Sequence, residues 1–166
     1  MRTRGFTIVE LLVVITVMAI LIPVTMFSIG GLNKTSRDRE RESDVSSIAR
    51  QLELVYTNKT VGSSPTYPGT TSLGGSATPP RESVFGGSTS EITKAPNSSG
   101  FSIVAATNTT ATTSGVRPVP TPTTYVYQPI PKSGSAVCTS LCSSFNLYYL
   151  NESDSSIIMV KSQRQQ

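Results

Sequence analysis

One carboxylate lies inside a long apolar segment near the N-terminus. Residues 6–29 are largely aliphatic, and Glu10 is the only charged residue among them. A carboxylate in bilayer hydrocarbon costs about 2.5–3.5 kcal/mol on insertion scales, so this position requires a compensating partner. We expect that partner to lie on another copy of the chain.

The apolar segment is long enough to cross a membrane. A helix over residues 6–29 would be about 36 Å long, against a hydrocarbon core of about 30 Å. Arg2 and Arg4 precede it, so the positive-inside bias places that side in the cytoplasm and residues 30–166, enough for one domain, outside. A secretory signal peptide and a plain membrane anchor are alternatives, although the apolar core of a signal peptide usually has about 7–15 residues.

The residues around Glu10 follow the order of a processing motif. Basic residues precede Gly5, Phe6 follows it, and Glu10 begins an unbroken aliphatic run. This order resembles the N-terminus of type IV prepilins and the related pseudopilins. The resemblance implies that a membrane-embedded aspartyl peptidase cuts between Gly5 and Phe6 and then methylates the new Phe6 amine.

The same resemblance assigns a partner to Glu10. It implies that Glu10 meets the Phe6 amine of a neighbouring subunit, and the Thr7 hydroxyl could add a hydrogen bond. A buried amine and a buried carboxylate are each costly alone, and pairing relieves both costs. The alternative is that Glu10 only reaches the lipid headgroups, since it lies close to the start of the apolar segment.

Pro23 and the pair Gly30 and Gly31 predict a disturbance of the first helix. Proline removes one helical hydrogen bond and tends to kink a helix, and adjacent glycines weaken it. We expect a kink or a locally extended backbone between Pro23 and Leu32. The alternative is that the two glycines only mark the exit from the membrane.

Residues 37–42 alternate in charge from one residue to the next. On a helix their (i, i+3) pairs are opposite in sign and their (i, i+4) pairs are alike. Each pair contributes about 0.2–0.5 kcal/mol in either direction, so the two sets largely cancel. Two interpretations stay open: a solvated face, or charges that meet complementary charges on adjacent subunits.

An amphipathic helix follows this charged run. Its apolar residues fall within one arc of a helical wheel, which predicts a face packed against a sheet; they are Val45, Ile48, Ala49, Leu52, Val55 and Tyr56. Leu54 points to the opposite side. Residues 41–56, followed by Tyr67 and Pro68, are similar to the exposed half of the long pilin helix and the turn after it.

The rest of the chain predicts a small β domain. Residues 59–124 are rich in Ser, Thr, Gly and Pro, and we expect a connecting region there, much of it weakly ordered, with one strand at 101–105. Alternating patterns predict strands at 125–127, 145–150 and 156–161, with a hairpin loop at 151–155. The predicted fold is therefore α+β, a long N-terminal helix packed on a small C-terminal antiparallel β-meander.

These patterns divide the chain into five parts. They are a leader at 1–5, a transmembrane and polymerisation helix at 6–29, the exposed amphipathic half of the helix at 30–58, the connecting region at 59–124 and the sheet at 125–166. Cys138 and Cys142 are the only cysteines. Outside the cytoplasm we expect them to form a disulfide, with free thiols as the alternative.

Nothing in the sequence indicates catalysis. The chain has no histidine, no nucleophile beside a base and no cluster of metal ligands, so we expect no enzymatic activity, no metal and no cofactor. The net charge of +4 is too small to indicate nucleic-acid binding by itself. Nucleic acid stays an open alternative partner, because tyrosines on strands can stack on bases.

The resemblance implies a structural pilin. Such a subunit is held in membrane lipid as a single-pass protein with its N-terminus in the cytoplasm. An assembly platform and a cytoplasmic ATPase then polymerise it, with copies of itself and related pilins, into an extracellular filament. A pseudopilin of a type II secretion system is an alternative, and a membrane-anchored binding domain is an alternative of another class.

Overall fold

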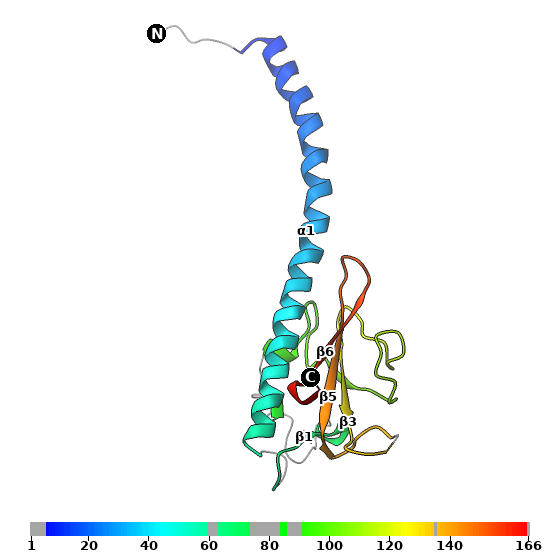
Figure 1. Cartoon of the computed structure of the whole chain (residues 1–166). Coiled ribbons are helices and arrows are strands. Elements are labelled where there is room, and N and C mark those ends of the chain that lie inside the picture. Colours follow the sequence, from blue (N-terminus) through cyan, green and yellow to red (C-terminus); the bar gives the residue numbers. More distant parts are fainter. Residues whose placement is uncertain (1–5, 60–62, 74–83, 86–90, 135, 166) are drawn as a thin grey trace.

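The computed structural model describes residues 6–59, 63–73, 84–85, 91–134 and 136–165, with the backbone alone at residues 25–30 and 165. One long helix, α1 (Ile8–Thr57), runs along the molecule, and its C-terminal half packs on a sheet (Figure 1). The predicted α+β fold is confirmed.

Helix α1 begins at a well-formed cap. Thr7 has an extended backbone, and its hydroxyl oxygen accepts a hydrogen bond from the backbone N–H of Glu10 at 3.3 Å. Such a cap satisfies one of the donors that a helix start leaves unpaired.

Pro23 lies inside α1, and the backbone stays helical through Gly30 and Gly31 to Leu32 and beyond. The alternative of a locally extended backbone there is therefore not observed. A proline removes only one bond of the ladder, and the turns on either side continue it cooperatively. The helix curves along its length (Figure 1), and a kink between Pro23 and Leu32 stays a prediction.

The main sheet has four strands in the order β2-β3-β5-β6. They are β2 (Ile103–Ala105), β3 (Tyr125–Ile130), β5 (Ser144–Leu150) and β6 (Ile157–Lys161). The pairs β3/β5 and β5/β6 are antiparallel, as predicted, but β2 pairs with β3 in parallel. The sheet is therefore mixed, because a long connection at 106–124 carries the chain back to the start of β3.

Strand β3 continues beyond the predicted end at residue 127 and includes Pro129. The backbone of Tyr127 faces β2, since its carbonyl accepts from the Ala106 N–H at 2.8 Å. By alternation, the nitrogen of Pro129 points to the same side, where β2 has already ended at Ala105. The missing proline N–H therefore costs no bond to β5.

A second, two-stranded sheet joins β1 (Tyr67–Pro68) to β4 (Leu141–Cys142), and neither strand was predicted from the sequence. Cys138 and Cys142 form the predicted disulfide. The loop that it closes lies on the chain after β1. The N–H of Thr70 donates to the Cys138 carbonyl at 3.1 Å, and that of Thr71 donates to the Thr139 carbonyl at 3.3 Å.

The core lies between α1 and the inner face of the main sheet. The helix contributes Val45, Ile48, Leu52 and Val55, each at most 2% exposed, and Ala49 and Tyr56 pack beside them. The sheet contributes one side of β3 and β5, namely Tyr125, Tyr127, Phe145, Leu147 and Tyr149.

The connecting region covers the opposite face of the sheet. Val116 packs there against Val126 and Tyr148. The side-chain amide of Gln128 donates to the carbonyl oxygens of Asn108 and Thr110 at 2.9 and 3.2 Å. Residues 106–118 therefore help to build a second small core. The expectation of weak order over much of 59–124 stays a prediction.

Candidate functional site

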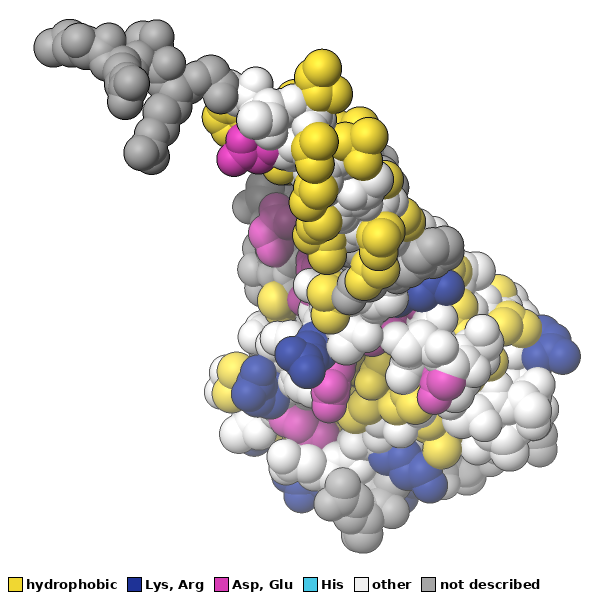
Figure 2. Space-filling view, turned by 90° about the horizontal axis from the view of Figure 1, so that it is seen from above, with side chains coloured by type: hydrophobic (Ala, Val, Ile, Leu, Met, Phe, Trp, Pro, Cys, Tyr) yellow, Lys and Arg dark blue, Asp and Glu magenta, His cyan; other side chains and the backbone are white. Residues whose placement is uncertain are grey.

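The first half of α1 extends away from the rest of the molecule (Figure 1). We call residues 8–36 the arm, and the other described residues, from 37 onward, the head. Every described side chain of the arm is exposed. Figure 2 shows hydrophobic side chains gathered along it, and the large ones are Ile8, Val9, Leu11, Leu12, Val13, Val14, Ile15, Val17, Met18, Ile20, Leu21, Ile22, Val24 and Leu32.

So much contiguous apolar surface is unusual in a soluble monomer, and it marks a surface that other molecules cover. Over the part of the chain that the structure describes, no helix holds a stretch long and apolar enough to count as a membrane span.

Three of the predicted site residues lie together at the free end of the arm. Phe6 precedes the cap and is 80% exposed, Thr7 is the cap, and Glu10 lies in the first turn. A carboxylate in the first turn is favoured by the positive end of the helix dipole. Gly5, the other residue of the predicted cleavage site, lies outside the described residues.

The charged run at the base of the arm turns partly toward the head. Arg37, Asp38 and Arg41 contact the loop between β5 and β6, whereas Arg39 and Glu42 are exposed. Neither interpretation of the alternating charges describes the first three residues, because their partners belong to their own head.

A signal for this arrangement was present in the sequence. Arg41 lies four positions before Val45, and Val45 lies three before Ile48, so Arg41 continues the spacing of the buried stripe. The predicted stripe begins at Val45, one turn after Arg41, and arginine is rarely buried in proteins.

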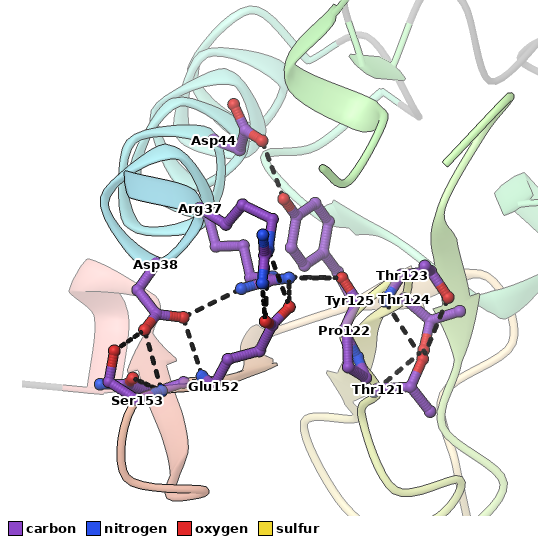
Figure 3. A network of polar contacts seen from close by, with 12 residues as sticks. Arg37, Asp38, Asp44, Thr121, Pro122, Thr123, Thr124, Tyr125, Glu152 and Ser153 are labelled. Carbon is purple, nitrogen blue, oxygen red and sulfur yellow. Dashed lines mark hydrogen bonds and ion pairs between the residues drawn. The ribbon is translucent and has the colours of Figure 1, made fainter. Parts of the chain in front are cut away.

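The next turn of the helix makes another polar contact with the sheet. The Tyr125 hydroxyl donates to the Asp44 carboxylate at 2.8 Å (Figure 3). Burial raises the pKa of Asp44 to about 6, although the bond from Tyr125 acts in the opposite direction. Burial, together with the bond to Asp44, also raises the pKa of Tyr125.

The C-terminal end of α1 contacts Tyr67 and the last residues of the chain. The Glu53 carboxylate accepts from the Tyr67 hydroxyl at 2.7 Å and from the Gln163 N–H at 2.9 Å. The guanidinium of Arg164 lies 4.7 Å from the centre of the Tyr56 ring, a cation–π contact. In the described part of the chain, no group of three or more His, Cys, Asp or Glu side chains could hold a metal ion.

A match to a protein family covers the free end of the arm. Residues 1–22 match the family model of the prokaryotic N-terminal methylation motif. The chain carries that motif. It is characteristic of type IV pilins and pseudopilins, and here it includes most of the large apolar residues of the arm and none of the head. Searches of curated proteins and of solved structures found no match.

Proposed function

We propose that the chain is a structural subunit of a type IV pilus-like surface filament. One observation carries this proposal: the methylation motif, residues 1–22, includes the first half of an arm whose described side chains are all exposed and mostly apolar. Such a surface requires a cover. Membrane lipid covers it before assembly, and the arms of other copies cover it in the filament.

The proposal includes processing by prepilin peptidase. Phe6 lies outside α1 and is largely exposed, so the bond between Gly5 and Phe6 precedes the helix rather than lying within it. Cleavage there would remove the basic leader at 1–5. The amine of Phe6, once methylated, would become the N-terminus of the mature subunit.

Electrostatics supports the proposed role of Glu10. A cationic amine on Phe6 would lie at the positive end of the dipole of α1, which disfavours it there. A carboxylate beside that amine offsets the cost, and in hydrocarbon both charges need such a partner. Glu10 of a neighbouring subunit would supply it, and Thr7, whose oxygen caps the helix, still has a hydroxyl proton to donate.

The exposed residues of the charged run at 37–42 are available to neighbouring copies. Glu40, with Arg39 and Glu42, stays exposed on α1. These side chains would pair with complementary charges on adjacent subunits in the assembled filament. Assembly would require the platform and ATPase that the resemblance implies.

Mass spectrometry of the N-terminus of the chain purified from its own cells tests the processing step. We expect a chain that begins at methylated Phe6. A chain that keeps Met1, or one cut near Gly30, would overturn the proposal for both a pilus and a secretion pseudopilus.

Substitution of the arm carboxylate tests the assembly step. Glu10→Val should abolish or strongly reduce filaments seen by electron microscopy, while membrane insertion is unchanged. Thr16→Val is the matched control, because the Thr16 hydroxyl bonds only to the Val13 carbonyl of its own helix, at 2.8 Å. Normal filaments from Glu10→Val would refute the pairing role.

A further inference from the structure

A fully buried arginine lies where the arm meets the head. Arg41 has no exposed surface, and its guanidinium binds three segments at once. It donates to the Asp38 carboxylate at 2.9 Å and to the Pro122 carbonyl at 2.9 and 3.1 Å, and it forms an ion pair with Glu152. Helix α1, the turn before β3 and the β5–β6 loop therefore meet at this one side chain.

Two further residues complete the cluster. Arg37 donates to the Glu152 carboxylate through two nitrogens, the shorter contact being 2.5 Å. Asp38 accepts from the backbone N–H groups of Glu152 and Ser153 at 2.8 and 3.0 Å, and from the Ser153 hydroxyl. Figure 3 shows the loop residues facing α1 through these contacts.

The cluster is balanced in charge, with two guanidinium groups facing two carboxylates. Arginine does not lose its proton in proteins, so Arg41 stays cationic in its buried position. Loss of one carboxylate charge therefore leaves an excess positive charge out of contact with water, which is strongly unfavourable. Such a cluster favours two states, fully paired or open to solvent.

We propose that Arg37, Asp38, Arg41 and Glu152 form an acid-releasable latch that holds the β5–β6 loop against α1. At neutral pH the latch is closed, and the loop and the helix move as one unit. Protonation of its carboxylates opens it, which frees residues 151–155 and exposes Arg41 to water. This device belongs to the head and does not depend on the proposed filament.

The surrounding charges set the direction of the response. The bonds from Arg37 and Arg41 lower the pKa of Glu152 against the effect of burial. Burial would raise the pKa of Asp38, but the bonds from Ser153 and the Glu152 amide lower it. Both groups therefore stay ionised at neutral pH, and their stabilisation is lost as the pH falls through the lowered values.

Other ionisable groups lie around the latch. Asp44 and Tyr125 bond to each other one turn along α1, Glu40 and Glu91 act on Asp44, and Asp154 is exposed in the same loop. The pKa of Asp44 is raised, so its contribution to stability is lost as the pH rises, whereas that of the latch carboxylates is lost as the pH falls. The opposite pH dependence distinguishes Asp44 from the latch.

Hydrogen exchange of the full chain in detergent micelles tests the latch. The amides of Glu152 and Ser153 report on it directly, because both donate to Asp38. In Glu152→Gln at pH 7 we expect these amides to exchange about tenfold faster or more than in the unaltered chain. After correction for intrinsic rates, acidification from pH 7 to pH 3 should accelerate them strongly in the unaltered chain and less in the variant, in which Asp38 is the one remaining latch carboxylate.

Matched controls come from the same segments. Asp154→Asn changes an exposed carboxylate of the same loop, and Arg39→Gln changes an exposed arginine of the same run, so both should keep the unaltered profile. Arg37→Gln removes a half-exposed partner of Glu152, and it replaces Glu152→Gln as the test variant if Glu152→Gln does not fold. Unchanged exchange in Glu152→Gln and Arg37→Gln, or the same pH response in Glu152→Gln as in the unaltered chain, would overturn the proposal.

Discussion

The arm and the head-bound part of α1 belong to one continuous helix, yet they use their side chains in opposite ways. Along the arm every described side chain is exposed, and apolar residues occur on all sides. From Arg41 onward one stripe is buried and the other faces stay polar, apart from residues such as Leu54, which is 53% exposed.

This difference shows where each half obtains its stability. The head-bound half is held by its own sheet, through the core and the latch. No described residue of the head covers the described side chains of the arm, so this apolar surface is available to lipid or to other copies. A substitution should therefore affect folding in the head and assembly in the arm, and four predictions test this contrast.

Truncation of one leucine in each half should give the largest contrast. Leu52→Ala removes a fully buried side chain and should lower the free energy of unfolding by about 2–5 kcal/mol. Leu12→Ala, at a position 55% exposed, should change it by less than about 0.5 kcal/mol. Urea denaturation followed by tyrosine fluorescence measures both, and equal losses would contradict the contrast.

Two glycines should respond in opposite directions. A Cβ on Gly69 would lie 2.1–2.2 Å from backbone atoms of Thr139 and Ser140, so Gly69→Ala should cost about 3 kcal/mol through overpacking. A Cβ on Gly31 meets nothing within 4 Å, and Gly31→Ala should raise helix stability by about 1 kcal/mol.

Thermal denaturation measures the effect of Gly69→Ala, and circular dichroism measures that of Gly31→Ala. If Gly69→Ala is as stable as the unaltered chain, the disulfide loop does not pack on this segment as described.

Reduction of the disulfide should affect the head alone. The bridge closes a loop between residues four apart, and its loss should cost about 2 kcal/mol in the chain-entropy model. Denaturation with and without a reductant measures the loss. The double variant Cys138→Ser, Cys142→Ser should be equally destabilised and insensitive to the reductant, and a response from it would show that the effect arises elsewhere.

The pH dependence of the head should give the smallest effect. Because folding raises the pKa of Asp44 to about 6, its contribution to stability is full below about pH 4 and is lost as the pH rises to about 6. The group is partly exposed, so we expect a change of at most about 1 kcal/mol.

Asp44→Asn keeps an acceptor for the Tyr125 hydroxyl and should remove this slope of the free energy of unfolding against pH. Urea denaturation at pH 4.5 and pH 7 measures it. An unchanged slope in the variant would assign the pH dependence to another group.

Features set by neighbouring residues were predictable from the sequence. Helical geometry relates residues three and four apart. It therefore predicts a helix over the apolar run, with Glu10 near its start, and the buried stripe from Val45 to Val55. The strands at 145–150 and 156–161 follow from alternation, and the disulfide joins the only two cysteines of the chain.

Features set by residues far apart in the chain were not predictable from the sequence. No local pattern shows that β2 pairs in parallel with β3, since that depends on how the 106–124 connection returns. The pairing of Glu152 with Arg37 and Arg41 joins segments more than a hundred residues apart. The strands β1 and β4 have two residues each, too few to show a period.

By itself, the sequence determined the methylation motif, the apolar helical segment with Glu10 as its one charged residue and the stripe that faces the sheet, because each depends on short-range order. Only the tertiary structure decided that half of the charged run faces inward, with Arg41 buried. A charged side chain can be buried only where partners from other segments converge on it, and that convergence is a property of the folded chain.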